Sequence, residues 1–261
     1  MSLAKASSYM LYEKNLPQAF DGFKIAHISD LHSVPAEGIF EAVKENTPDI
    51  IAVTGDLVHD NDKPYDKTIS LMEKLSSLAP IYAVTGNHDL WRPNHNRIIK
   101  EIEDANVTFL RNEMVKLSKN GSEIAIFGME DPFSKIPDII AKNVADSYAQ
   151  LPEYDGFGIL LFHRANLFDL VKDFGFDLIL SGHMHGGQVR LPLIGGVCGP
   201  TSAILSKSGM LFPKYTAGIY NNKNTSMVVN RGVGNTLPVP RFGNPPDVGI
   251  VTLHRQNETA Y

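Results

Sequence analysis

The chain has 261 residues, of which 43 % are hydrophobic and 20 % are charged, a composition typical of a soluble globular protein. Its 24 basic and 29 acidic residues give a net charge of -5, which argues against nucleic-acid binding through an extended basic face. Cys198 is the single cysteine, so disulfides within the chain and zinc sites built on several thiolates are excluded. No apolar run reaches the roughly 18–20 residues of a membrane span, and the first residues lack a signal-peptide core.

Five short apolar runs are predicted to be strands covered on both faces, because each is nearly continuous and leads into polar residues. They are Phe23–Ser29, Ile50–Thr54, Ile81–Thr85, Phe157–Phe162 and Leu178–Leu180. Between them, apolar residues spaced three and four apart predict helices. These helices are expected near residues 39–45, 69–78, 98–102, 136–149 and 167–174. Alternation of strand and helix predicts an α/β fold with largely parallel central strands.

The last third of the chain has shorter β-like runs separated by Gly, Pro and Asn: Val189–Leu191, Thr216–Tyr220, Met227–Val229 and Val248–Leu253. A hairpin is predicted earlier, because Gly121 follows Leu117–Asn120 and precedes Ile124–Phe127, and Asn-Gly suits a tight turn. Mixed strands of this kind predict a second sheet packed on the first. Since no internal repeat or linker is evident, we expect a single domain over residues 1–261.

Carboxylate, amide and imidazole side chains directly follow the predicted strands, where open α/β sheets bind their ligands. They are Asp30 and His32, Asp56, Asn87 with His88 and Asp89, His163, and finally His183 and His185. Oxygen ligands mixed with imidazole suit Mn, Fe or Zn, and two such ions roughly 3.5–4 Å apart clamp a phosphate ester and supply a metal-bound hydroxide. Asp30-Leu31-His32 and Gly55-Asp56 alone are better explained by capping or turn chemistry, whereas the loops at 86–89 and 182–185 are more specific, the latter still compatible with a surface loop. Their occurrence in one order, each after a strand, favours a dinuclear site.

The five motifs together resemble the calcineurin-like metallophosphoesterase superfamily over about Phe23 to His185: Asp30-Leu31-His32, Gly55-Asp56, Gly86-Asn87-His88-Asp89, His163 and Gly182-His183-Met184-His185. The tail that begins at Gly186-Gly187-Gln188, together with Asn230-Arg231-Gly232, is similar to a bacterial branch of membrane-associated phosphoesterases. That branch includes UDP-2,3-diacylglucosamine pyrophosphatases.

The resemblance implies a four-layer α/β/β/α sandwich of two mixed sheets, with the metals at the C-terminal strand ends. It implies a first ion held by Asp30, His32 and His185, and a second held by Asn87, His163 and His183, with Asp56 bridging both. His88 is then left free of metal, where it can protonate the leaving oxygen or stabilise developing charge. Asp89 is expected to orient His88, as outer-sphere carboxylates do for imidazoles.

Three arginines are candidates for contact with substrate phosphate. Arg190 and Arg231 qualify because guanidinium binds phosphate in a bidentate manner. Arg164 belongs to the run His163-Arg164-Ala165-Asn166, which differs from the His-x-Pro pattern common in the superfamily. It either contacts the substrate or lies on the surface at a helix start.

Other residues near the motifs leave two interpretations open. Trp91 and Arg92 either form a wall of the substrate pocket or pin their loop to the next helix. The extended run Pro238–Pro246 either covers part of the site or simply crosses the surface. His59 and His95 either line the cleft or are incidental loop residues.

The sequence therefore predicts a metal-dependent phosphoesterase that hydrolyses a phosphate ester or pyrophosphate bond by attack of a metal-bound hydroxide. Its expected substrate is a phosphorylated small molecule or a lipid-linked compound such as a nucleotide-diphospho-lipid. The alternatives are a catalytically silent metal-binding scaffold and a nuclease. We expect the chain in the cytoplasm or peripherally at the bacterial membrane or cell envelope, with a removed upstream anchor left open.

Overall fold

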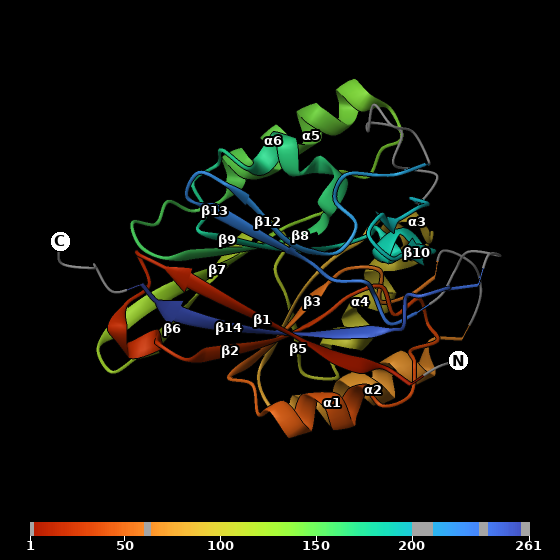
Figure 1. Ribbon diagram of the computed structural model, residues 1–261, viewed down its shortest axis with the longest axis horizontal. Coiled ribbons are helices and arrows are strands. Elements are labelled where there is room, and N and C mark those ends of the chain that lie inside the picture. The colour runs from red at the N-terminus through yellow and green to blue at the C-terminus, as the bar shows by residue number, and fades with distance from the viewer. Residues whose placement is uncertain (1–2, 60–63, 200–210, 235–239, 257–261) are drawn as a thin grey trace.

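The computed structural model describes residues 3–59, 64–199, 211–234 and 240–256. Two six-stranded sheets pack face to face, and helices cover the outer face of each sheet (Figure 1). The predicted four-layer α/β/β/α arrangement with two mixed sheets is thereby confirmed.

The first sheet has the order β1-β14-β2-β3-β4-β5. Its strands are β1 (Lys5–Glu13), β14 (Asp247–Arg255), β2 (Phe23–Ile28), β3 (Ile50–Thr54), β4 (Ile81–Val84) and β5 (Val107–Phe109). Strands β2 to β5 run parallel, as predicted, whereas β14 is antiparallel to β2 and parallel to β1. The strand predicted at Val248–Leu253 therefore lies in the first sheet, because its Val251 and Leu253 join the core beside β2.

The second sheet has the order β12-β13-β9-β8-β7-β6. Its strands are β12 (Gly218–Asn222), β13 (Thr225–Val229), β9 (Leu178–Gly182), β8 (Gly158–Arg164), β7 (Ser122–Met129) and β6 (Glu113–Lys119). The four central strands are parallel, and β6 and β12 are antiparallel edges. The predicted hairpin is confirmed as β6–β7, with positive φ at both Asn120 and Gly121.

Helices form at all five predicted places: α1 (Ile39–Asn46), α2 (Asp66–Ser76), α4 (His95–Glu103), α5 (Pro137–Gln150) and α6 (Phe168–Val171). Figure 1 shows α1 and α2 against the first sheet and α5 and α6 against the second. A short helix, α3 (Asn87–Trp91), follows β4, and three 3-10 turns are η1 (Gln18–Phe20), η2 (Ala165–Leu167) and η3 (His185–Gly187). Among the described residues, no helix has the length and apolarity needed to cross a bilayer.

An apolar core fills each of the three spaces between the layers. In β2, Ile25 faces the second sheet, whereas Ala26 and Ile28 face the helices. The strand thus buries both faces, which explains its continuous apolar sequence. His27 is also buried, and its Nε2 lies 2.9 Å from Thr54 Oγ1.

Candidate metal centre

The carboxyl ends of strands from both sheets meet at one end of the sandwich. Asp30 and His32 follow β2, Asp56 follows β3, and α3 follows β4 in the first sheet. His163 is the next-to-last residue of β8, and His183 and His185 follow β9 in the second sheet. Contacts of β3 with β8 and β9 bring these ends together. The site therefore lies between the two sheets.

The backbone at this end is held in an uncommon conformation. Five of the seven predicted metal ligands have positive φ, a region that non-glycine residues seldom occupy: Asp30 (56°), His32 (52°), Asp56 (52°), His183 (71°) and His185 (47°). Such conformations cost of order 1–3 kcal/mol each and cluster at functional sites. These backbone conformations therefore lower the stability of the fold while they direct the ligand side chains toward one another.

One group of side chains consists of Asp30, His32 and His185, all buried. The Nε2 atoms of His32 and His185 lie 3.2 Å apart. Asp30 Oδ1 lies 3.7 Å from His32 Nε2 and 3.4 Å from His185 Nε2. Three ligand atoms thus converge on one point.

A second group consists of Asp56, His163 and His183. His163 Nε2 lies 3.2 Å from Asp56 Oδ2 and 3.2 Å from His183 Nδ1. The same Asp56 Oδ2 is 3.7 Å from Nε2 of His32 in the first group. Asp56 therefore stands between the two groups.

Two buried oxygens supply a test of whether a metal fits. Asp30 Oδ1 and Asn87 Oδ1 accept no hydrogen bond from any residue within the described ranges. A buried acceptor left without a donor is costly, and cation binding offsets that cost. Carboxylate, amide oxygen and imidazole together suit Mn, Fe or Zn. The residues present fit a metal.

The charge state of the carboxylates is set by the imidazoles around them. Burial alone would raise the pKa of Asp30 and Asp56, but nearby histidines lower both below the ordinary range. For His163, burial is likewise outweighed by Asp56, which raises its pKa to about 10. Burial lowers the pKa of His185 to about 3 and that of His183 well below its ordinary value. Both carboxylates are therefore ionised at neutral pH, while His183 and His185 are neutral.

Backbone contacts fix the orientation of the ligands. The His163 Nδ1 atom lies 2.7 Å from the Thr54 carbonyl oxygen, which directs Nε2 toward Asp56. A side chain added at Gly86 would collide with Asp56, so glycine is required at this close approach. These contacts keep the cluster in shape.

His88 lies beside the two groups and forms a third candidate group with His32 and Asp56. Its backbone N–H donates to Asp56 Oδ1 at 2.8 Å, and its ring centroid is 4.9 Å from that of His32 and 4.8 Å from that of Trp91. Trp91 thus packs beside the predicted catalytic histidine. His59 also faces it, with ring centroids 5.1 Å apart, whereas His95 Nδ1 lies 3.0 Å from the Arg92 carbonyl.

Asp89 holds the loop that carries His88. Its carboxylate accepts hydrogen bonds from the backbone N–H groups of Gly86 and Val58, at 2.8 and 2.9 Å. Burial, and then the nearby Asp56, raise the pKa of Asp89 to about 7. That Asp89 also orients the imidazole ring of His88 stays a prediction.

The three arginines predicted to bind phosphate all have protein partners. Arg164 is buried, not on the surface, and its Nε and Nη2 both donate to Asp131 at 2.6 Å. Arg190 Nη1 donates to the Gly186 carbonyl, and Arg231 donates to Asp247. Arg190 and Arg231 are half-buried, whereas Arg164 is buried, and contact of any of the three with substrate stays a prediction.

Arg241 is a cation near the cluster that sequence reasoning did not single out. Its Nη2 lies 3.5 Å from His185 Nδ1 and donates to the Gly234 carbonyl, and Asn244 Nδ2 donates to the His185 carbonyl. Burial lowers the pKa of Arg241 to about 10, which leaves it protonated at neutral pH. The described part of Pro238–Pro246 therefore packs against the site, whereas 238 and 239 lie outside the described residues.

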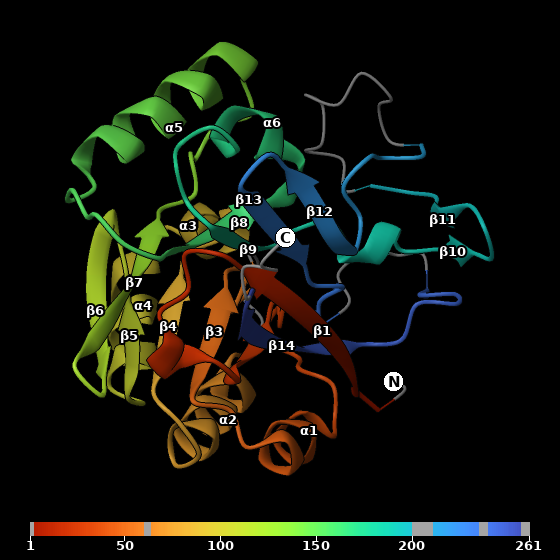
Figure 2. The same ribbon diagram turned by 60° about the vertical axis from the view of Figure 1, so that its left-hand side comes forward.

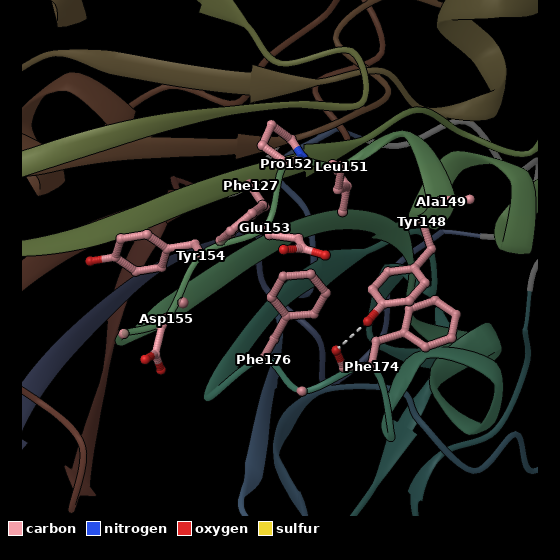
Figure 3. Close-up of a pocket in the computed structure, with 13 residues that line it drawn as sticks. Phe127, Tyr148, Ala149, Leu151, Pro152, Glu153, Tyr154, Asp155, Phe174 and Phe176 are labelled. Carbon is pink, nitrogen blue, oxygen red and sulfur yellow. Dashed lines mark hydrogen bonds between the residues drawn. The ribbon is translucent and has the colours of Figure 1, made fainter.

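A separate cavity of about 740 Å³ lies at the opposite end of β8 and β9. Figure 3 shows its aromatic walls, with Phe127, Phe176 and Tyr148 around the Glu153 carboxylate. Among the described residues that line it, none is a predicted site residue. The metal-competent cluster, and not this cavity, has the groups for phosphoester chemistry.

Comparison with known proteins agrees with the geometry. The profile of the calcineurin-like phosphoesterase family matches residues 23–187. The metallophosphoesterase YkuE of Bacillus subtilis is 29 % identical over 267 residues, covering 98 % of this chain and 87 % of YkuE. The phosphodiesterase YaeI of Escherichia coli is also 29 % identical, with 88 % of this chain and 82 % of YaeI covered.

Two further similarities extend the comparison. The UDP-2,3-diacylglucosamine pyrophosphatase LpxG of Chlamydia muridarum is 26 % identical, covering 90 % of this chain and 86 % of LpxG. The structure of a phosphopantetheinyl hydrolase from Mycobacterium tuberculosis superposes with a TM-score of 0.51 at 13 % identity, covering 80 % of this chain and 89 % of that one, which supports the fold alone. Because the family profile spans more than half of the sequence, the chain belongs to the calcineurin-like phosphoesterase family and is a hydrolase that acts on phosphoester bonds.

Proposed function

We propose that the chain is a phosphodiesterase or pyrophosphatase that uses two divalent ions, drawn from Mn, Fe and Zn, to cleave a lipid-linked substrate. One observation carries the proposal: Asp56 Oδ2 stands 3.2 Å from His163 Nε2 and 3.7 Å from His32 Nε2. A single carboxylate between two convergent groups is suited to bridging a pair of ions.

In this proposal, Asp30, His32 and His185 would hold the first ion and Asn87, His163 and His183 would hold the second, with Asp56 available to both. When bound, the ions would polarise phosphoryl oxygens and acidify a water molecule. The ionised Asp30 and Asp56 offset the charge of the ions. Asn87 and the histidines add no negative charge, which leaves enough positive charge on the ions to attract a phosphate.

His88 supplies the proton for the leaving oxygen in the proposed reaction. The short helix α3 carries it, and that helix is fixed by the hydrogen bonds of Asp89 to Gly86 and Val58. Rings of His32, His59 and Trp91 surround the imidazole and restrict its orientation. A positioned histidine of this kind typically contributes 10²–10⁴-fold to a rate.

The substrate class rests on two relatives. YaeI is named a phosphodiesterase and LpxG a UDP-2,3-diacylglucosamine pyrophosphatase. Both names describe cleavage at a phosphoryl group that is linked to other groups through two of its oxygens. We extend this class to the present chain, with Arg190 and Arg231 as candidate contacts for the distal phosphate or sugar. A net charge of -5 makes nucleic acid a poor candidate.

The test is reconstitution of chelator-treated protein with Mn, Zn or Fe separately. Metal content is measured by elemental analysis. Turnover is measured on phosphomonoesters, phosphodiesters, cyclic nucleotides and nucleotide-diphospho-lipids. We expect two ions per chain and faster turnover of diesters or pyrophosphates than of monoesters. One ion or none, with no turnover on any substrate, would identify a binding scaffold. Degradation of DNA at catalytic enzyme concentration would identify a nuclease.

A further inference from the structure

Large apolar side chains gather on the surface beside the metal centre. They surround the hairpin of β10 (Arg190–Leu191) and β11 (Gly195–Gly196), which projects from the sandwich in Figure 2. Leu193 is fully exposed, and Phe242 and Ile194 are exposed by 65 % and 59 %. We call the exposed set the hairpin patch: Leu191, Leu193, Ile194, Leu211, Phe212 and Phe242. Contiguous exposed apolar side chains of this kind mark interaction surfaces.

Backbone pairing holds the patch together. Arg190 N–H donates to the Phe242 carbonyl at 2.8 Å, and Phe212 N–H donates to the Val197 carbonyl at 2.8 Å. Leu211 forms an isolated bridge with Cys198. Three segments distant in sequence therefore present their apolar residues from one paired framework.

The same framework rests directly on the metal-competent cluster. Cys198 N–H donates at 3.0 Å to the carbonyl of Gly187, which lies two residues after His185. Arg190 Nη1 donates to the Gly186 carbonyl at 2.9 Å. The hairpin patch is thus continuous with the turn that carries a proposed metal ligand.

The tip of the hairpin is not optimised for folding. Ile194 N–H donates to the Leu191 carbonyl across a tight turn, and Leu193 within it has φ of 66°. Turn positions with positive φ favour Gly or Asn. A leucine that is both strained and fully exposed indicates a function outside the fold.

The charge of this part of the chain differs from that of the rest. Residues 178–246 contain six basic residues and no aspartate or glutamate, although the whole chain has a net charge of -5. Lys214 is paired with Asp169, and among the described residues Arg190 and Arg241 are the cations that adjoin the hairpin. Apolar residues flanked by cations match the composition of an anionic lipid surface.

We infer that the hairpin patch inserts into the surface of an anionic bilayer and holds the metal centre against it. This membrane contact rests on the proposed function, because a lipid-linked phosphoester is the substrate that such a contact would supply. The six apolar side chains enter the interface, and Arg190 and Arg241 face the anionic headgroups. The substrate's phosphate then reaches the cluster without leaving the membrane.

The experiment measures cosedimentation of the full chain with vesicles of phosphatidylcholine, with or without roughly one-third phosphatidylglycerol. The variant Leu193→Asn/Ile194→Thr removes two exposed apolar side chains, and asparagine tolerates the positive φ. The matched control is Ile139→Gln/Leu170→Gln, which removes two exposed apolar side chains from α5 and α6. Turnover of a soluble chromogenic phosphodiester reports the state of the metal centre in each protein.

We expect wild type and control to bind the anionic vesicles and the hairpin variant to bind at least about tenfold more weakly, with soluble turnover unchanged. Equal binding by all three proteins, or no binding by wild type, overturns the inference. So does a wild-type dimer that the hairpin variant dissociates, because the patch would then be covered by a second chain. Loss of vesicle binding in the variant without soluble turnover in any protein would contradict the proposed function and support the lipid surface.

Discussion

Buried or half-buried carboxylates occur at both ends of the parallel strands, and their pKa values shift in opposite directions at the two ends. At the carboxyl ends, Asp30 and Asp56 are surrounded by imidazoles, which hold the pKa of each carboxylate below its ordinary range despite burial. At the opposite end, Glu13 accepts from Ser226 Oγ, and Asp177 accepts from the Gly158 N–H. Burial raises the pKa of both, that of Glu13 to about 7.

The difference teaches what distinguishes a ligand site from a structural polar cluster. Burial is common to both ends, so burial alone does not identify function. At the structural end, the carboxylates accept hydrogen bonds from neutral donors. At the metal end, Asp30 Oδ1 accepts none from the described residues while two imidazole nitrogens face it. An ionised carboxylate with one buried oxygen that has no donor, while its other oxygen accepts from the His183 N–H, indicates a place for a cation.

The largest expected effect is on Asp56, tested against Asp177. Asp56→Asn removes the carboxylate that we propose both ions share, so turnover of a chromogenic phosphodiester should fall on the order of a thousandfold and bound metal should decrease. Asp177→Asn makes the same chemical change at the other end and should leave turnover within about twofold. Full activity of Asp56→Asn in metal-replete protein would remove the distinction between the two ends.

The next effect concerns His88, which stands beside the ligands without being assigned to a metal. His88→Ala should keep both ions while losing about 10²–10³-fold in turnover, because a proton donor is removed. Elemental analysis with steady-state kinetics checks both parts. His254→Ala is the matched control, since His254 lies at the opposite end beside Asp21. Metal loss in His88→Ala would make His88 a ligand instead.

Arg164 sharpens the comparison, because it lies at the metal end yet is paired with Asp131 by two hydrogen bonds of 2.6 Å. Arg164→Met leaves Asp131 buried and unpaired, which should lower the free energy of unfolding by about 3–5 kcal/mol. Denaturant unfolding measures this loss, and Arg164→Met/Asp131→Leu should recover much of it. KM for the phosphodiester should change little; a large rise in KM in the stable double variant would restore Arg164 as a substrate contact.

Much of this architecture could be predicted because its signals are local. Strands such as β3 and β8 are buried on both faces, so they appear as apolar runs, and the motif residues directly follow or end them. Strand β1 was not predicted, because it is a half-exposed edge whose partner is β14 at the other end of the chain. Its pairing depends on a contact between residues nearly the whole sequence apart, which no local pattern encodes.

The same limit applies at the site. The five motifs identify the residues that converge, but Arg241 meets His185 only through the return of a distant loop. Arg241 lies alone in a proline-rich segment, and nothing in the neighbouring sequence except its charge indicates that it approaches the site. The hairpin patch was also missed, because a short apolar run predicts an exposed turn no better than a buried strand. The assigned roles of individual ligands stay predictions until the variants above are measured.

The smallest expected effect is on stability at the opposite end. The folded-state pKa of Glu13, about 7, lies above its ordinary value of 4.5, so the folded state binds the extra proton between these pH values. Stability from Glu13 is therefore fully present below about pH 4.5 and is lost as pH rises through 7. Glutamine imitates the protonated form, so Glu13→Gln should be nearly neutral at low pH and stabilising above pH 7.

The full shift would be worth about 3 kcal/mol, but Glu13 is only half-buried and solvent screens it, so we expect about 1 kcal/mol at pH 8. Thermal or denaturant unfolding of Glu13→Gln and wild type at pH 5 and pH 8 measures the difference. Glu123→Gln, on an exposed carboxylate of β7, is the control and should show no such pH dependence. An equal increase in the free energy of unfolding of Glu13→Gln at both pH values would mean that burial does not raise the pKa of Glu13. The contrast between the two ends would then rest on hydrogen bonding alone.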